Sequence, residues 1–223
     1  MIAEENLSNI STPSISVSNT NIVMRINKLM INTIPYFKSY LISGFHKKKN
    51  LNEEDLTQFF TKQAQILIRK NDYPFNIEGE YKDAYNLSKG FSDFFFYPNE
   101  QNVSTASIFS VESKRLPSPS KSREKEYVIG DKNNGGIERY KTEKHGKGLF
   151  KCGLLGFIEQ ENSKHWLKEI NNWIWNLSIV DKSWNQDEIL SEIESKADFC
   201  LLKSIAHRKH DDIDLTHLWV ILN

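Results

Sequence analysis

Apolar residues recur at helical spacing in several segments of the chain. Four helices are predicted, over residues 21–45, 51–69, 163–177 and 186–196, and residues 137–144 add one or two helical turns. Pro35 should break or kink the first helix, because proline has no N–H to donate inside a helix. Asn52 suits the N-cap of the second helix, whose first turn is acidic, and Ser163 suits that of the third.

Other segments have the length and residue types of strands. The predicted strands are 75–81, 90–97, 106–116, 154–158, 199–207 and 213–222. Strands 90–97 and 106–116 flank a turn at Pro98-Asn99 and are expected to form an antiparallel hairpin. The last two strands should pair around residues 209–212. Helices and strands in this order indicate an α/β fold with a mixed sheet.

Two stretches lack such patterns. Residues 1–20 are rich in Ser, Asn and Thr with little to bury, which predicts a disordered N-terminal arm. Residues 117–136 contain two prolines and an Asn-Asn-Gly-Gly run, so they should form a long loop that is either functional or disordered. The remaining residues, 21–223, fit one domain, because compact domains commonly have about 100–200 residues.

Charge is balanced over the whole chain but not along it. The 223 residues include 29 Lys and Arg and 29 Asp and Glu, so net charge indicates no partner. From Lys114 to Lys151 there are eleven basic residues against five acidic ones, and from Cys152 to Asp198 there are four against nine. The basic segment either presents an anion-binding face or is a Lys-rich solvated loop.

Cysteine usage and hydropathy limit the class of protein. Cys152 and Cys200 are far apart and beside apolar runs, which favours buried free thiols over a disulfide or a zinc site. The sequence has no signal-peptide pattern and no run of about 18 apolar residues. These observations predict a soluble, cytoplasmic protein without a membrane contact.

The strongest chemical signal is an aspartate followed by a Glu-x-Lys pattern. Asp93 lies in one predicted strand and, after eighteen intervening residues, Glu112 and Lys114 lie in the next. Because strand side chains alternate, Glu112 and Lys114 share a face and lie about 6.6–6.8 Å apart along the strand. Two carboxylates suit a hard cation such as Mg²⁺, which neutralises a phosphodiester and acidifies an attacking water. Lys114 can hold or deprotonate that water and stabilise the charge on the phosphate. A surface ion pair at Glu112 and Lys114, with Asp93 as a turn residue, would give the same sequence pattern. The apolar strands around both parts of the motif favour a catalytic site instead.

This pattern resembles that of the PD-(D/E)xK nucleases, also called the restriction-endonuclease-like superfamily. The resemblance covers the order of elements over residues 51–174, its motif is Asp93, Glu112 and Lys114, and Ser92 stands where the superfamily name has proline. It implies a mixed sheet flanked by helices, Mg²⁺ or Mn²⁺ as cofactor with Asp93 and Glu112 as ligands, endonuclease cleavage of DNA, and a possible homodimer. Short segments further resemble uncharacterised bacterial restriction-like proteins, which implies a role in defence against foreign DNA. These segments are 90–93, 111–116, 135–140 and 217–219.

Further residues are candidates for the same site. The superfamily often takes another acidic ligand from the first helix, so Glu54 is a candidate metal ligand, as is Glu80, which ends the strand before Asp93. Helix capping explains Glu54 equally well. The backbone amides of Gly135 and Gly136, at the start of a helix, can lie near phosphate, or the pair is an ordinary Gly-rich turn into that helix. The basic residues expected to contact DNA are Arg139, Lys141, Arg115, Lys121 and Arg123.

Some conspicuous residues have simpler explanations, and two other functions remain open. His207, His210 and His217 invite a metal-site interpretation, but residues three apart on a strand face opposite sides, so turn or sheet-face roles are favoured. The tryptophans and the Phe94-Phe95-Phe96 run favour core packing over base stacking. The alternatives to a nuclease are an inactive nuclease-fold module, which binds nucleic acid or serves as a subunit of a larger complex such as a defence complex, and an unrelated α/β interaction protein.

Overall fold

The computed structural model describes residues 19–82 and 90–223. Most of the predicted N-terminal arm, residues 1–18, lies outside this part, and the first helix begins at Asn19. The helices are α1 (Asn19–Ile42), α2 (Glu53–Asn71), α3 (Gly136–Lys141) and α4 (Ser163–Val180), with short 3-10 turns η1 (Lys121–Arg123) and η2 (Gln186–Glu188). The strands are β1 (Phe75–Lys82), β2 (Phe91–Pro98), β3 (Phe109–Leu116), β4 (Lys151–Ile158), β5 (Ser191–Ser195), β6 (Phe199–His207) and β7 (Asp212–Ile221).

The strands of the described residues form one mixed sheet of seven strands, in the order β1-β2-β3-β4-β7-β6-β5. Neighbours are antiparallel from β1 to β3, parallel from β3 through β4 to β7, and antiparallel again from β7 to β5. The predicted β2–β3 hairpin and the pairing of the last two strands are both confirmed. The chain is therefore an α/β protein with a mixed sheet.

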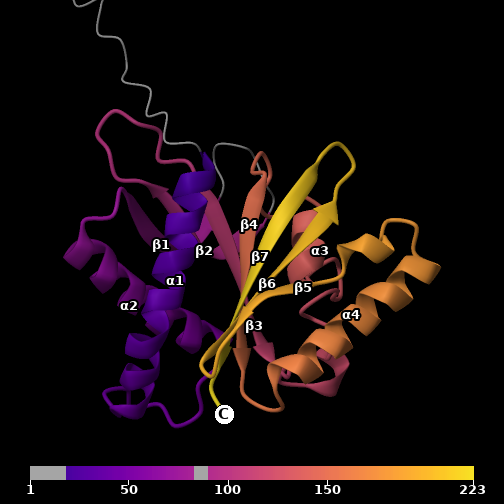
Figure 1. The fold of residues 1–223 in the computed structure, drawn as a ribbon, viewed down its shortest axis with the longest axis horizontal. Coiled ribbons are helices and arrows are strands. Elements are labelled where there is room, and N and C mark those ends of the chain that lie inside the picture. Colours follow the sequence, from indigo (N-terminus) through magenta and orange to yellow (C-terminus); the bar gives the residue numbers. More distant parts are fainter. Residues whose placement is uncertain (1–18, 83–89) are drawn as a thin grey trace, which may run out of the picture.

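Helices cover both faces of this sheet (Figure 1). α1 and α2 pack over one core, and α3 and α4 pack over a second core on the other face. Phe109 and Val111 of β3 belong to the first core, while Leu116 belongs to the second. The alternation predicted for this strand is confirmed, and it turns Glu112 and Lys114 toward the face that carries α3. The buried tryptophans pack in the second core, whereas Trp175 is half exposed.

The helix ends partly follow the sequence. Asn52 caps α2 as predicted, because its side chain accepts from the N–H of Asp55 while the Asp55 carboxylate accepts from the N–H of Asn52. The cap of α4 is Asn162, not Ser163: Asn162 has the extended backbone of a cap residue and accepts an N–H of the first turn. Pro35 lies inside α1, and the helix continues past it.

The helix predicted over residues 186–196 is wrong. This segment forms the single turn η2 and then the edge strand β5, which pairs with β6. Asn171 of α4 binds both the N–H and the C=O of Leu190, so these backbone groups are not available to a helix. Leu190 is buried in the second core, whereas Ile189 and Ile193 are 40% and 54% exposed.

The predicted loop of residues 117–136 is anchored to the second core. Tyr127 and Val128 are buried in it. The Tyr127 hydroxyl lies 2.9 Å from Nδ1 of His217 and accepts from the indole N–H of Trp219 at 2.8 Å. Burial lowers the pKa of His217 to about 3, so its ring is a neutral part of the core. The loop therefore has one fixed path past β3.

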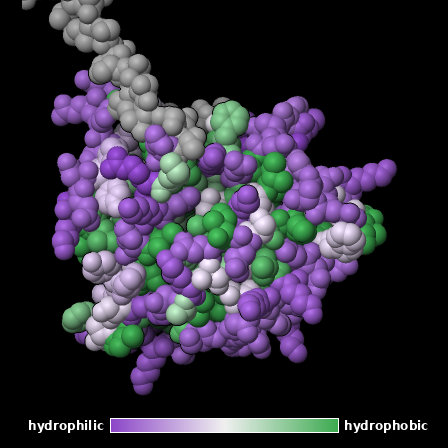
Figure 2. Space-filling view, viewed as in Figure 1, coloured by the Kyte–Doolittle hydropathy of each residue, from purple (hydrophilic) through white to green (hydrophobic). Residues whose placement is uncertain are grey.

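The surface is mostly polar. Hydrophilic side chains predominate on the face in Figure 2, with apolar ones scattered among them. Within the described residues, none of the helices has the length and apolar character needed to cross a bilayer. Cys152 and Cys200 are buried free thiols, as predicted.

Candidate active site

Asp93 and Glu112 lie on the paired strands β2 and β3. Phe94 pairs with Val111, and both belong to the core under α1 and α2. Asp93 precedes Phe94, and Glu112 follows Val111. Because strand side chains alternate, both carboxylates point away from that core, to the other face of the sheet. Asp93 is held by its Oδ2 atom, which accepts a hydrogen bond from the N–H of Ser113 at 2.6 Å. Both carboxylates are thus on the face that carries α3.

Glu112 is fully buried, and its two oxygens have different surroundings. Oε1 accepts hydrogen bonds from the Lys114 ammonium, at 2.8 Å, and from the Arg139 guanidinium. Oε2 lies 3.1 Å from Nδ1 of His145, but the two atoms are not aligned for a hydrogen bond. Among the described residues, neither of these two buried atoms has a hydrogen-bond partner. Oε1 is therefore held by two hydrogen bonds, whereas Oε2 faces His145 alone, with which it forms an ion pair if that ring is protonated.

Lys114 connects this pair of strands to α2. Its buried ammonium also donates to Oε1 of Glu53 at 3.2 Å and to the Ser113 carbonyl at 2.9 Å. The second oxygen of Glu53 accepts from the N–H of Arg115 at 3.0 Å, which fixes the start of α2 against β3. The first helix thus contributes a carboxylate to the site, and that carboxylate is Glu53.

These contacts set the charge of each group. Burial opposes ionisation of Glu112, but Lys114 and the other nitrogen groups around it outweigh burial and lower its pKa to about 2. Burial also opposes the charge of Lys114, yet Glu112 and the neighbouring carboxylates raise its pKa above the usual range, so it stays an ammonium. For Asp93, burial together with repulsion from Glu112 raises the pKa to about 7. A cation beside Asp93 would relieve this unfavourable charge.

The donors fit a divalent cation. Asp93 and Glu112 offer hard carboxylate oxygens, and Oε2 of Glu112 is a buried acceptor to which no described residue donates a well-aligned hydrogen bond. Over residues 19–82 and 90–223, no three His, Cys, Asp or Glu side chains form a group that could hold a metal by itself. A cation at this place would complete its shell with water and phosphate oxygens, as Mg²⁺ commonly does with one or two carboxylates.

Asp93→Asn should stabilise the metal-free protein, and more so at pH 8 than at pH 5. The pKa of Asp93 is about 7 in the folded protein against 3.8 ordinarily. The folded protein therefore loses stability as the pH rises from about 4 through 7, because this buried carboxyl must give up its proton. The amide keeps an oxygen for the Ser113 N–H and removes the charge. We expect the gain in unfolding free energy to be larger at pH 8 by about 1 kcal/mol or more. Denaturant unfolding in chelator measures it, and an equal effect at both pH values would contradict the repulsion.

The other acidic candidates, Glu54 and Glu80, are both exposed. Glu54 is exposed in the first turn of α2, beside Glu53 but on another side of the helix. Glu80 is exposed in β1, which β2 separates from β3. The register of β1 and β2 places it opposite Asp93, between the pairs Gly79–Phe94 and Tyr81–Ser92, and its φ is 53°. The structure therefore brings together Asp93, Glu112 and Lys114, and the carboxylate that α2 contributes is Glu53 rather than Glu54.

The basic candidates divide into two groups. Arg139 reaches Glu112, and it also lines a hollow of about 620 Å³ whose other basic residues are Lys121, Arg123 and Lys125. Arg123 is ion-paired with Glu126, and acidic residues alternate with the basic ones there. The hollow is thus less basic than the residue count of the segment indicates.

Arg115 and Lys141 have other partners. Nε of Arg115 donates to Glu159 at 2.6 Å. The Lys141 side chain is 5% exposed, forms an ion pair with the fully buried Glu188, and donates to the His207 carbonyl at 3.1 Å. These contacts hold its ammonium within the fold and disfavour the predicted DNA contact of Lys141, which stays a prediction.

The glycines before α3 also have a structural role. The N–H of Gly136 donates to the Glu126 carbonyl, and the N–H of Gly135 donates to the Glu138 carboxylate. Both amides therefore have acceptors within the protein, which favours the ordinary Gly-rich turn over phosphate contact. A Cβ on Gly135 would lie 2.2 Å from the backbone of Ile129, so glycine is required for close packing of α3 against the loop.

Two members of the cluster were not predicted. Glu53 lies on the same helix face as the buried residues Leu56 and Phe60. This position on the apolar face is the sequence feature that could have selected Glu53 over Glu54. His145 lies in a turn of no regular pattern, and nothing in the sequence marks it. His207 is paired with Asp187 and Asp212 at the surface, so this residue serves the turn, in line with the interpretation favoured for it.

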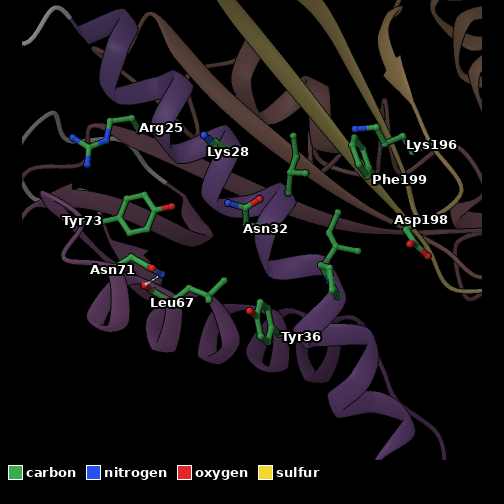
Figure 3. Close-up of a pocket in the computed structure, with 13 residues that line it drawn as sticks. Arg25, Lys28, Asn32, Tyr36, Leu67, Asn71, Tyr73, Lys196, Asp198 and Phe199 are labelled. Carbon is green, nitrogen blue, oxygen red and sulfur yellow. Dashed lines mark hydrogen bonds between the residues drawn. The ribbon is translucent and has the colours of Figure 1, made fainter.

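Another hollow, of about 780 Å³, lies along α1 (Figure 3). α1 lines it together with the end of α2 and the turn between β5 and β6. Its charged residues are Arg25, Lys28, Lys196 and Asp198, and none of its lining residues belongs to the cluster around Glu112. This hollow is therefore separate from the candidate site.

Comparison of the chain with models of protein families, with curated proteins and with solved structures gives no match.

Proposed function

We propose that this protein is a metal-dependent nuclease of the PD-(D/E)xK type that hydrolyses phosphodiester bonds in DNA. The observation that carries the proposal is the convergence of Asp93, Glu112 and Lys114 from two paired strands, with one buried carboxylate oxygen free of hydrogen bonds. The mixed sheet between helices supports a restriction-endonuclease-like fold. A role in bacterial defence and a homodimer that cuts both strands are further parts of this proposal.

The residues of the cluster have distinct tasks. Asp93 and Glu112 would hold Mg²⁺ or Mn²⁺, which supplies an acidified water and neutralises the phosphate. Lys114 keeps its proton because three carboxylates surround it, so it orients the water and stabilises negative charge on the phosphate rather than acting as a base. Glu53 and Glu112 fix the ammonium from two sides. Arg139 lies between the carboxylates and the hollow, where it can contact a phosphate that enters.

A cleavage assay on the purified chain tests the proposal. Supercoiled and linear duplex DNA, single-stranded DNA and RNA are incubated with Mg²⁺ or Mn²⁺, with and without chelator. We expect cleavage of DNA that requires the cation and stops in chelator. Binding of nucleic acid without cleavage of any substrate would instead identify an inactive nuclease-fold module. Neither binding nor cleavage would favour an unrelated interaction protein.

Lys121→Ala combined with Lys125→Ala should make DNA binding weaker and less dependent on salt. Both side chains are exposed beside Arg139 at the hollow, so they can neutralise phosphates of the backbone. Each lost phosphate contact lowers the slope of log affinity against log salt by about 0.9. Titration of a labelled duplex at several salt concentrations measures this slope. The control is Lys164→Ala with Lys168→Ala, which removes the same charge from the exposed side of α4. Equal effects of the two double variants would contradict a defined DNA face.

A further inference from the structure

We infer that His145 binds the divalent cation of the proposed active site together with Oε2 of Glu112, and that this centre therefore prefers Mn²⁺ to Mg²⁺. The role of the cation in cleavage rests on the proposed function, whereas the binding of the cation by these two residues can be tested without it. The inference adds a nitrogen ligand to a site for which the sequence indicated carboxylates alone.

The separation of the two atoms is that of neighbouring ligands on one metal ion. Nδ1 of His145 and Oε2 of Glu112 are 3.1 Å apart, yet they are not aligned as donor and acceptor. Octahedral ions of this class bind their ligands at about 2.1 Å, which places two adjacent ligands about 3.0 Å apart. With a protonated ring the two atoms form a direct ion pair, whereas a neutral ring offers the Nδ1 lone pair and Oε2 as two adjacent ligands to a cation.

The surrounding groups hold both atoms in this arrangement. Lys114 and Arg139 bind only Oε1 of Glu112, which leaves Oε2 as the oxygen that a cation can use. The N–H of His145 donates to the Arg139 carbonyl at 3.1 Å, and its ring packs edge-on against Tyr140. The opposite edge of the ring lies over Gly90, where a Cβ would be 2.5 Å from Cδ2 and Nε2. The ring therefore presents Nδ1 to the carboxylate.

The donor set selects among cations. Mg²⁺ is bound almost wholly by oxygen and retains several waters. Imidazole nitrogen is a softer donor that suits first-row transition ions, and Mn²⁺ accepts it while still favouring carboxylate and phosphate oxygens. Asp93 adds a carboxylate on the neighbouring strand β2, where its Oδ2 accepts the N–H of Ser113. Glu112 with His145 thus favours Mn²⁺ over Mg²⁺.

Pulsed electron paramagnetic resonance on the full chain with Mn²⁺ as the only cation tests this inference directly. A coordinated imidazole modulates the Mn²⁺ spin echo through its ¹⁴N nucleus, and labelling the protein with ¹⁵N-histidine changes the modulation. We expect this ¹⁴N signal in the wild type and its loss in His145→Asn, whose side chain is a poor metal ligand of similar reach. In calorimetric titrations, His145→Asn should weaken Mn²⁺ binding by at least about tenfold, since even indirect supports of a metal site are worth 10–100-fold. Its effect on Mg²⁺ should be smaller.

His165→Asn on the exposed side of α4 is the matched control and should keep both the signal and the affinity. Mn²⁺ bound without an imidazole signal, or no Mn²⁺ binding by the wild type, would overturn the inference. The labelled wild type alone decides this even where His145→Asn does not fold. A wild type that shows the histidine-dependent signal but cleaves no nucleic acid would uphold the metal site while the proposed nuclease activity fails.

Discussion

Lys114→Met should reduce metal-dependent DNA cleavage by about 10²-fold or more without lowering affinity for the cation. The ammonium is the group placed to orient the water and stabilise charge on the phosphate, and it contributes no ligand to the metal. Glu112→Gln should cause a loss of cleavage at least as large for a different reason. It replaces the carboxylate that is expected to bind the cation with a neutral amide, which is a weaker ligand. The two variants therefore separate catalysis from metal binding.

Single-turnover cleavage and Mn²⁺ calorimetry on the same preparations measure both effects. Circular dichroism and thermal unfolding confirm that each variant folds, since Lys114→Met leaves Glu53 without its ammonium partner. The charge-matched control is Lys168→Met on the exposed side of α4, which should cleave like the wild type. Cleavage by Lys114→Met at the wild-type rate would show that the catalytic site lies elsewhere.

The sheet and the centre of the site could be predicted because they depend on local pattern. The alternation of residues 109–116 assigns Glu112 and Lys114 to one face, and the turn after β2 indicates the hairpin that sets Asp93 opposite Glu112. These features require only the period of a strand and the chemistry of a turn.

The remaining parts of the site depend on contacts between distant segments. His145 meets Glu112 only because α3 and its preceding loop fold over β3, and no periodic pattern records that packing. Residues 186–196 have helical spacing, but Asn171 binds the backbone of Leu190 and β6 offers an open edge, so tertiary contacts override the local preference. Positive charge alone makes Lys141 a candidate for DNA contact. In the fold, however, its ammonium pairs with the buried carboxylate of Glu188, which lies far along the chain.

Lys141→Met should lower the free energy of unfolding by about 3–5 kcal/mol and leave the DNA affinity of the folded protein unchanged. Its ammonium is the charged partner of Glu188, which is fully buried and also accepts the N–H groups of His207, at 2.8 Å, and Asn185, at 2.7 Å. Removing one member of a buried ion pair leaves the other charge uncompensated, which is the reason for the large cost. Lys141 also lies 4.7 Å above the Trp184 ring, a contact that is lost with the charge.

A double-mutant cycle separates this charge effect from loss of packing. Lys141→Met combined with Glu188→Gln removes both charges and should recover part of the stability, because no isolated carboxylate remains buried. Lys125→Met, at an exposed position, should change stability by no more than about 0.5 kcal/mol. Denaturant unfolding of the four members of the cycle gives the coupling energy, and duplex titration below the unfolding temperature gives the affinity. A Lys141→Met protein that is as stable as the wild type but binds DNA more weakly would return this residue to the nucleic-acid interface.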